Sequence, residues 1–205
     1  MNYKDHVAEL NGTIPTTPEI FTKPATTLIG PCDPIVLPKA APKAVDGEVE
    51  LTIVLNRECK DVDAASAMDY VLGYTLANDV TCRDIQAGIL QWGYCKGFDT
   101  FCPLGPALVS PKALPDPHLL ELKTVLDGQV QQDGNTKNMI FSVPHIIEYV
   151  SRGTTLPKGT VILTGTPAGI GHSFDPPRYL HDGAILRLGI SGGIGTLTNP
   201  VIEAK

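Results

Sequence analysis

The sequence lacks a run of apolar residues long enough to cross a membrane, and it has no basic stripe. Its 16 lysines and arginines are outnumbered by 22 aspartates and glutamates, which gives a formal net charge of -6 at pH 7. These absences argue against nucleic acid and anionic membrane as partners. A small anionic substrate stays open, because a local metal outweighs the global charge.

Paired cysteines are also missing from this sequence. The five cysteines, at positions 32, 59, 82, 95 and 102, form an odd set without a CxxC pair. This pattern argues against a disulfide framework and against a structural zinc site. The first residues, Met1 to His6, are polar and do not resemble a secretory signal. We therefore expect a reducing compartment, the cytoplasm, with mitochondria as the alternative.

Glycine and proline, by contrast, are abundant. The 205 residues include 20 glycines and 18 prolines, and no internal repeat is visible. This length suits one sizeable core, and the composition favours a loop-rich, mostly β enzyme with few helices. We predict a single domain over residues 1–205, of the α+β class and mainly β.

The most informative stretch is Glu48-Val49-Glu50-Leu51, followed by the apolar residues 52–55. A turn signal precedes it and β-branched residues follow, so the pattern predicts a strand. Because side chains alternate along a strand, Glu48 and Glu50 should face the same side. Two such carboxylates repel each other unless a cation or proton neutralises them. A metal site and a solvated strand edge both remain open for this stretch.

A third carboxylate follows another apolar segment. Residues 70–77 are predicted to lead into a strand that ends at Asn78-Asp79. Together, Glu48, Glu50 and Asp79 offer three oxygen ligands with room for water and substrate. Such a set would suit Mg²⁺ or Mn²⁺.

A candidate base lies near the start of the chain. Residues 3–10 predict a short helix, in which His6 and Glu9 lie three residues apart on one face. Glu9 could orient the imidazole, or the two could form an ordinary surface pair. Lys23 falls in a short strand predicted over residues 19–24 and, on local pattern, belongs to the surface.

The remaining elements follow from turn and capping signals. Gly165 to Gly171 cannot be a phosphate loop, since no Gly-Lys-Ser/Thr follows, but its backbone and threonines could cradle a carboxylate. We expect loop and short strand over residues 26–44, a helix over 62–72 that ends at Gly73, a helix or turn over 81–86, an irregular loop over 95–106, a hairpin around Asp127-Gly128, a helix over 142–149, and strands over 161–163, 184–190 and 195–201.

Several weak motifs gain meaning from their order along the chain. They are Asn2-Tyr3-Lys4-Asp5-His6-Val7-Ala8-Glu9, Glu48-Val49-Glu50-Leu51, Asn78-Asp79 with Arg83-Asp84 and Gln86, Lys96-Gly97-Phe98-Asp99, Leu163-Thr164-Gly165-Thr166-Pro167-Ala168-Gly169 and Gly195-Thr196-Leu197-Thr198-Asn199-Pro200. In this order the chain resembles the fumarylacetoacetate hydrolase family, nearest to its acylpyruvate hydrolases and oxaloacetate decarboxylases. The resemblance covers nearly the whole chain.

The resemblance implies a fold, a metal and a set of residue roles. The fold would be the mixed β-roll of the fumarylacetoacetate hydrolase C-terminal domain, assembled as a homodimer. The implied roles are metal ligation of Mg²⁺ or Mn²⁺ by Glu48, Glu50 and Asp79, stabilisation of an enolate by Lys96, activation of water by His6 with Glu9 from a mobile lid over residues 1–15, and lining of the substrate pocket by Lys23, Gln86 and Thr166.

The function implied in this way is metal-dependent cleavage of a carbon–carbon bond in acylpyruvate-type 2,4-dioxo acids, through a metal-bound enolate. The same site could instead support oxaloacetate decarboxylation, which needs no activated water, or keto-enol and double-bond isomerisation. A non-catalytic family member is the remote alternative, because a fold alone does not fix a function.

Overall fold

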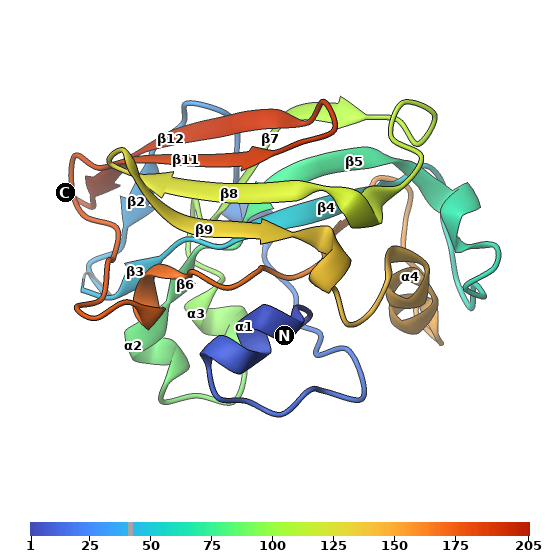
Figure 1. Ribbon diagram of the computed structural model, residues 1–205, viewed down its shortest axis with the longest axis horizontal. Coiled ribbons are helices and arrows are strands. Elements are labelled where there is room, and N and C mark those ends of the chain that lie inside the picture. The colour runs from blue at the N-terminus through green and yellow to red at the C-terminus, as the bar shows by residue number, and fades with distance from the viewer. Residues whose placement is uncertain (41–42) are drawn as a thin grey trace.

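A computed structural model describes residues 1–40 and 43–205 of the chain. Its strands form two five-stranded sheets that curl around a shared core, with a two-stranded ribbon and short helices beneath them in Figure 1. Both parallel and antiparallel pairs occur, so the sheets are mixed.

The first sheet carries the glutamate strand near its middle. Its order is β1 (Leu28–Ile29), β7 (Cys102–Val109), β5 (Val71–Asn78), β4 (Val49–Leu55) and β10 (Val161–Leu163). The antiparallel register of β4 and β5 pairs Val49 with Asn78, so the start of one strand lies beside the end of the other. The strands predicted from the glutamate stretch and before Asp79 are confirmed.

The second sheet is built mainly from the C-terminal half of the chain. Its order is β2 (Ile35–Leu37), β12 (Gly195–Glu203), β11 (Ile185–Ile190), β8 (Glu121–Leu126) and β9 (Gln129–Asn135). The predicted hairpin turn joins β8 to β9, and Asp127 and Gly128 both have positive φ angles, 47° and 80°. Such angles are typical of a tight hairpin turn, which explains the glycine.

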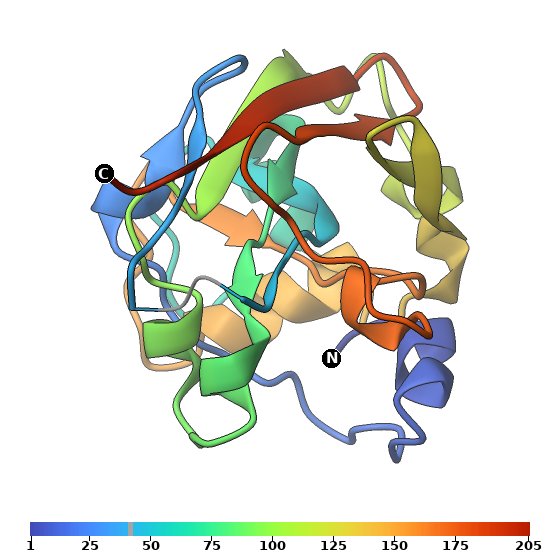
Figure 2. The ribbon, with the colours of Figure 1, turned by 90° about the vertical axis from the view of Figure 1, so that its left-hand side faces the viewer.

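Side chains that alternate along the strands fill the space between the sheets. Leu51, Ile53 and Leu76 from the first sheet and Leu122 and Leu188 from the second are buried in one cluster. Figure 2 shows the strands in the upper part of the molecule and the N-terminal residues, in blue, along its lower side. The predicted class, mainly β in a mixed roll with a few short helices, is confirmed.

The helices are short and lie outside the sheets. They are α1 (Lys4–Glu9), α2 (Arg83–Gln86), α3 (Trp92–Cys95) and α4 (Val143–Ser151), and the ribbon consists of β3 (Val45–Asp46) and β6 (Thr81–Cys82). As predicted, Ser142 caps α4 by accepting a hydrogen bond from the His145 N–H. The helices predicted near residues 3–10 and 81–86 are likewise present.

The helix predicted over residues 62–72 is wrong. Only a single 3₁₀ turn forms, over residues 67–70, and Val71 already begins β5. Gly73 pairs with Val54 inside the sheet and does not end a helix. A side chain there would lie 2.7 Å from the Val109 carbonyl oxygen, so glycine is needed for the close approach of β7. Sheet pairing thus overrides the local helix propensity.

Three further expectations can be compared with the structure. The strand predicted over residues 19–24 is wrong: this segment pairs with no strand among the described residues, and it borders the cavity described below. Residues 102–106 of the predicted loop belong to β7. The prediction of loop and short strand over 26–44 is confirmed for its described residues, which include β1 and β2, and positions 41 and 42 lie outside them.

Two features bear on the environment of the chain. All five cysteines are free thiols. Within the described ranges, every helix is too short or too polar to pass through a membrane. The single-domain prediction over residues 1–205 and the lid role of residues 1–15 stay predictions.

Candidate active site

Three carboxylates meet where β4 begins and β5 ends. Glu48 stands directly before β4, Glu50 lies within it, and Asp79 directly follows β5. The Asp79 N–H donates to the Glu48 carbonyl at 2.9 Å and fixes this junction. One oxygen from each side chain lies within 4.8 Å of the others, and all three side chains are buried. The predicted clustering is confirmed, and the alternative of a solvated strand edge is wrong.

Lys96, from the loop after α3, is buried against two of these carboxylates. Its Nζ donates to Glu48 at 3.0 Å, to Asp79 at 2.6 Å and to the Thr81 hydroxyl at 2.7 Å. Burial alone would lower the pKa of Lys96, but Asp79 and Glu48 hold the pKa above its ordinary value. The lysine is therefore charged and all three of its donors are used. Contact with an enolate, which stays a prediction, would require one of these partners to be released.

Two further cations complete the charge pattern. Arg83 lies 2.7 Å from Glu48 and 3.1 Å from Asp46, and Lys23 lies 2.7 Å from Asp79. The Lys23 side chain is only 10% exposed, so the interpretation of Lys23 as a surface residue is wrong. It lies in the candidate site, as the family resemblance implied.

The two glutamates differ in their electrostatics. Burial would raise the pKa of Glu48, but Lys96 and Arg83 outweigh it and hold that pKa below its ordinary value. For Glu50, burial and repulsion from Asp79 and Glu48 raise the pKa to about 8. Among the described residues, Glu50 pairs with no lysine or arginine, and its carboxylate accepts the Gly165 N–H. When ionised, Glu50 would therefore carry the least compensated charge in the cluster.

The predicted base and its orienting carboxylate form a pair in which His6 is buried and Glu9 is partly buried. His6 Nδ1 lies 2.8 Å from Glu9, whose other oxygen accepts the Gly169 N–H at 2.7 Å. The His6 side chain is 7% exposed, so the alternative of an ordinary surface pair is wrong. With Nδ1–H donating to Glu9, the Nε2 lone pair is left to act as a base.

These groups surround one cavity of about 660 Å³. All the predicted site residues except Glu9 line it, and Glu9 contacts the cavity residue His6. The rest of the lining is largely apolar and includes Leu10, Ile20, Phe21, Trp92, Ile146 and Ile162. The cavity therefore combines a charged region with apolar walls.

Gln86 and Thr166 line the cavity but already have protein partners. The Gln86 carbonyl oxygen accepts a hydrogen bond from Arg83 at 3.0 Å, which leaves its amide N–H groups as donors. The Thr166 hydroxyl donates to the Val49 carbonyl at 2.9 Å and accepts from the Gln132 amide at 2.7 Å. Its proton is thus used, and it can offer a substrate only its remaining lone pair. The substrate contacts of both residues stay predictions.

Arg83 and Asp46 were not among the predicted site residues. Arg83 bridges Glu48 and Asp46, and Asp46 also accepts the N–H groups of Gly171 and His172 at 3.0 and 2.9 Å. The Arg83-Asp84-x-Gln86 motif could have indicated that Arg83 belongs to the site. The role of Asp46 depends on contacts with residue 171 and cannot be found from local sequence.

The donor set fits a hard divalent cation. Three carboxylates from Glu48, Glu50 and Asp79 supply oxygen ligands of the kind that Mg²⁺ and Mn²⁺ prefer. A cation would also offset the poorly compensated charge on Glu50. It would compete with Lys96 and Lys23 for the other two carboxylates, so binding would rearrange these ion pairs.

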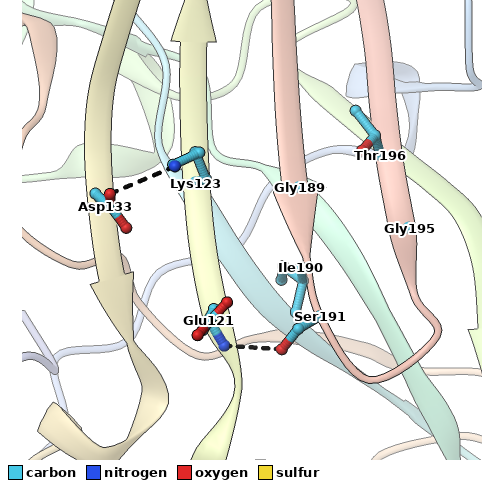
Figure 3. Close-up of a pocket in the computed structure, with 8 residues that line it drawn as sticks. All are labelled: Glu121, Lys123, Asp133, Gly189, Ile190, Ser191, Gly195 and Thr196. Atoms are coloured by element: carbon cyan, nitrogen blue, oxygen red, sulfur yellow. Dashed lines mark hydrogen bonds and ion pairs between the residues drawn. The ribbon is translucent and has the colours of Figure 1, made fainter.

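A second hollow, of about 240 Å³, lies on the outer face of the second sheet. Figure 3 shows Lys123 and Asp133 paired with each other on neighbouring strands, at 3.5 Å, beside the glycines of β11 and β12. None of the predicted site residues lines this hollow. The candidate chemistry therefore belongs to the larger cavity.

Comparison with known proteins identifies the family of the chain. The model of the family "Fumarylacetoacetate (FAA) hydrolase C-terminal" matches residues 1–202. A protein of Mycobacterium tuberculosis is 50% identical over 202 residues, which are 98% of this chain and 73% of the relative. The mitochondrial oxaloacetate tautomerase fahd2 of Xenopus laevis is 43% identical over 204 residues, 98% of this chain and 63% of the relative.

The fold also matches that of a solved structure. The crystal structure of 5-carboxymethyl-2-hydroxymuconate delta-isomerase from Mycobacterium smegmatis shares 45% identity and a TM-score of 0.87, and the match covers 100% of this chain and 77% of that chain. With a family match over nearly its whole length, the chain belongs to the fumarylacetoacetate hydrolase family.

Proposed function

We propose that the chain is a divalent-metal-dependent hydrolase that cleaves a carbon–carbon bond in acylpyruvate-type 2,4-dioxo acids. The observation that carries this proposal is the His6–Glu9 pair on the same cavity as Glu48, Glu50 and Asp79. Hydrolysis needs an activated water, and a histidine oriented by a carboxylate is a common base for that step.

The protein residues would divide the work of the reaction. When bound, the divalent cation would act as a Lewis acid toward the 2-oxo acid group. His6 Nε2 would take a proton from water while Glu9 holds Nδ1–H, and the water oxygen would attack the distal carbonyl carbon. The bond from that carbon to C3 then breaks, and its electron pair passes to the pyruvate fragment. Return of the proton from His6 to C3 completes pyruvate and a carboxylic acid.

The charge pattern of the cavity supports a substrate with one carboxylate. Lys23, Arg83 and Lys96 are the lysines and arginines that line it in the described part of the chain, and each is already paired with an aspartate or glutamate. Metal binding would release Lys96 or Lys23 from a carboxylate only beside the metal, so a second substrate carboxylate directed away from the metal would meet the apolar lining. Apolar walls such as Phe21 and Ile146 suit the alkyl end of an acylpyruvate.

Isomerisation is the second candidate function, because two of the similar proteins are named for such reactions. The Xenopus laevis relative is an oxaloacetate tautomerase, and the Mycobacterium smegmatis structure is an isomerase. The His6–Glu9 pair could serve this reaction by moving a proton between carbon and oxygen without attack by water. Oxaloacetate decarboxylation remains a further alternative on the same site.

Product analysis separates these reactions. The chain is incubated with Mg²⁺ or Mn²⁺ and with acetylpyruvate, a longer acylpyruvate or oxaloacetate, and products are identified by proton NMR. We expect pyruvate and the matching carboxylic acid from acylpyruvates, with higher kcat/KM for the longer chain and no cleavage in chelator. Enol–keto conversion of oxaloacetate without cleavage of any acylpyruvate would assign the tautomerase function instead.

Assembly and location belong to the same proposal. We propose a homodimer, as the family resemblance implies, and the cytoplasm as its location, with mitochondria as the alternative. The lid role of residues 1–15 is part of this proposal, since His6 and Leu10 of this segment line the cavity and Glu9 accepts the Gly169 N–H. Sedimentation of the purified chain would test the dimer.

A further inference from the structure

Gln132, in β9 of the second sheet, is fully buried and uses its whole hydrogen-bonding capacity. Its carbonyl oxygen accepts from the Val49 N–H at 3.0 Å and from the Thr124 hydroxyl at 2.8 Å. Its amide nitrogen donates to the Thr166 hydroxyl at 2.7 Å and to the Pro167 carbonyl at 2.8 Å. An amide has two donors and two acceptor sites, so all four are satisfied.

Three of these four partners belong to segments that hold the candidate site. Val49 lies between Glu48 and Glu50, so its N–H fixes the backbone that carries both carboxylates. Thr166 and Pro167 lie in the glycine-rich loop after β10. The Thr166 hydroxyl also donates to the Val49 carbonyl, which ties this loop to the same point of β4.

The glycine-rich loop in turn orients two functional carboxylates. Its Gly165 N–H donates to Glu50, and its Gly169 N–H donates to Glu9, the partner of His6. One loop thus holds a candidate metal ligand and the residue that orients the base. Any shift of this loop would move both groups together.

The loop packs against β9 without spare room. A side-chain carbon at Gly169 would collide with the Gln131 carbonyl, and one at Gly134 would collide with the Pro167 ring. These backbone contacts set the distance between the glycine-rich loop and β9. The hydrogen bonds of the Gln132 side chain set the position of the loop along β9. The second sheet therefore supports the site through this residue.

We infer that Gln132 is a positioning residue, which sets the geometry of Glu50 and of the His6–Glu9 pair through the glycine-rich loop. The inference rests on the proposed function. It gives a role in the reaction to a neutral side chain outside the cavity lining. Residues that orient ligands and bases from behind commonly matter for affinity and for rate.

Two substitutions at Gln132 and one control test this role. Gln132→Met keeps the side-chain length and removes every hydrogen bond. Gln132→Glu keeps the acceptor toward Val49 but puts an oxygen opposite the Pro167 carbonyl. The control, Thr124→Val, removes one buried hydrogen bond to the same side chain and leaves its three bonds to the site intact. Unfolding temperatures are measured for all variants to identify those that fold.

Mn²⁺ affinity by calorimetry gives a measure that is independent of turnover, and acetylpyruvate cleavage gives kcat and KM. In folded Gln132→Met and Gln132→Glu we expect a Kd for Mn²⁺ raised by about 10- to 100-fold and a kcat lowered by a similar factor. KM should change much less than kcat, because the loop orients His6 through Glu9, and His6 acts in the chemical step. Thr124→Val should stay close to the unaltered chain in both measurements.

The outcomes distinguish this inference from the proposed function. If the unaltered chain neither binds Mn²⁺ nor cleaves acylpyruvate, the proposed function is wrong, and the role given to Gln132 fails with it. If the unaltered chain does both, and the Gln132 variants match Thr124→Val, only the inference about Gln132 is overturned. It is also overturned if neither Gln132 variant folds, because the role of Gln132 is then structural.

Discussion

Replacing Glu50 by glutamine should stabilise the metal-free protein at alkaline pH, although it removes a candidate metal ligand. Glu50 is buried beside Asp79 and Glu48 and pairs with no lysine or arginine among the described residues. Ionising it in the folded chain is therefore unfavourable. Glutamine resembles the protonated carboxyl in shape and carries no charge, so it avoids that cost.

The pH window follows from the pKa values. An ordinary glutamate titrates near 4.5, whereas burial and the two neighbouring carboxylates raise the pKa of Glu50 to about 8. Below the lower value both folded and unfolded chains hold the proton. Between the two values only the folded chain holds it, so stability falls as pH rises. At about 1.36 kcal/mol per pH unit, the total loss is at most about 5 kcal/mol.

Urea unfolding of the metal-free protein across this pH range measures the effect. The wild-type chain should lose stability toward alkaline pH, and Glu50→Gln should lose less. Glu121→Gln, at an exposed position of β8, is the matched control and should follow the wild type. Added Mg²⁺ should restore stability to the wild type but not to Glu50→Gln. Equal pH dependence in the wild type and in Glu50→Gln would refute the argument.

Three other substitutions test the remaining roles. Glu48→Ala should abolish Mg²⁺ binding and turnover together, and calorimetry that shows unchanged affinity would contradict its assignment as a ligand. Lys96→Met should lower kcat by about 10²-fold without weakening Mn²⁺ binding, since Lys96 competes for two of the carboxylates; a kcat near that of the wild type would reject the role. His6→Ala should slow acylpyruvate cleavage by roughly 10²- to 10⁴-fold while largely sparing oxaloacetate decarboxylation, and equal loss of both would show that His6 does not activate water.

Local patterns predicted most strands and turns but misjudged the helix over residues 62–72 and the strand over residues 19–24. The apolar run after Glu48 and the Asp127-Gly128 turn carry their structure in neighbouring residues, and both were confirmed. Residues 62–72 have helix-forming side chains, yet β5 begins at Val71 because β4 and β7 offer pairing partners on both sides. The formation of a strand here depends on pairing with segments distant in sequence, and the local periodicity of residues 62–72 carries no information about that pairing.

In the candidate site, too, local sequence patterns predicted some residues and missed others. Glu48 and Glu50 could be paired from the two-residue period of a strand, and His6 and Glu9 from the turn of a helix. Lys23 looked like a surface residue, because its partner Asp79 is distant in sequence. Gln132 gave no signal at all: its four partners come from β4, β8 and the glycine-rich loop, and only the fold brings them together.

The central claim is that the buried carboxylates form the metal site of the reaction. Anomalous diffraction from crystals grown with Mn²⁺ tests it most directly. We predict one strong peak within about 2.5 Å of oxygens from Glu48, Glu50 and Asp79, with Lys96 displaced from at least one carboxylate. Well-ordered crystals at saturating Mn²⁺ that show no peak there, with Lys96 still bound to both Glu48 and Asp79, would contradict the account.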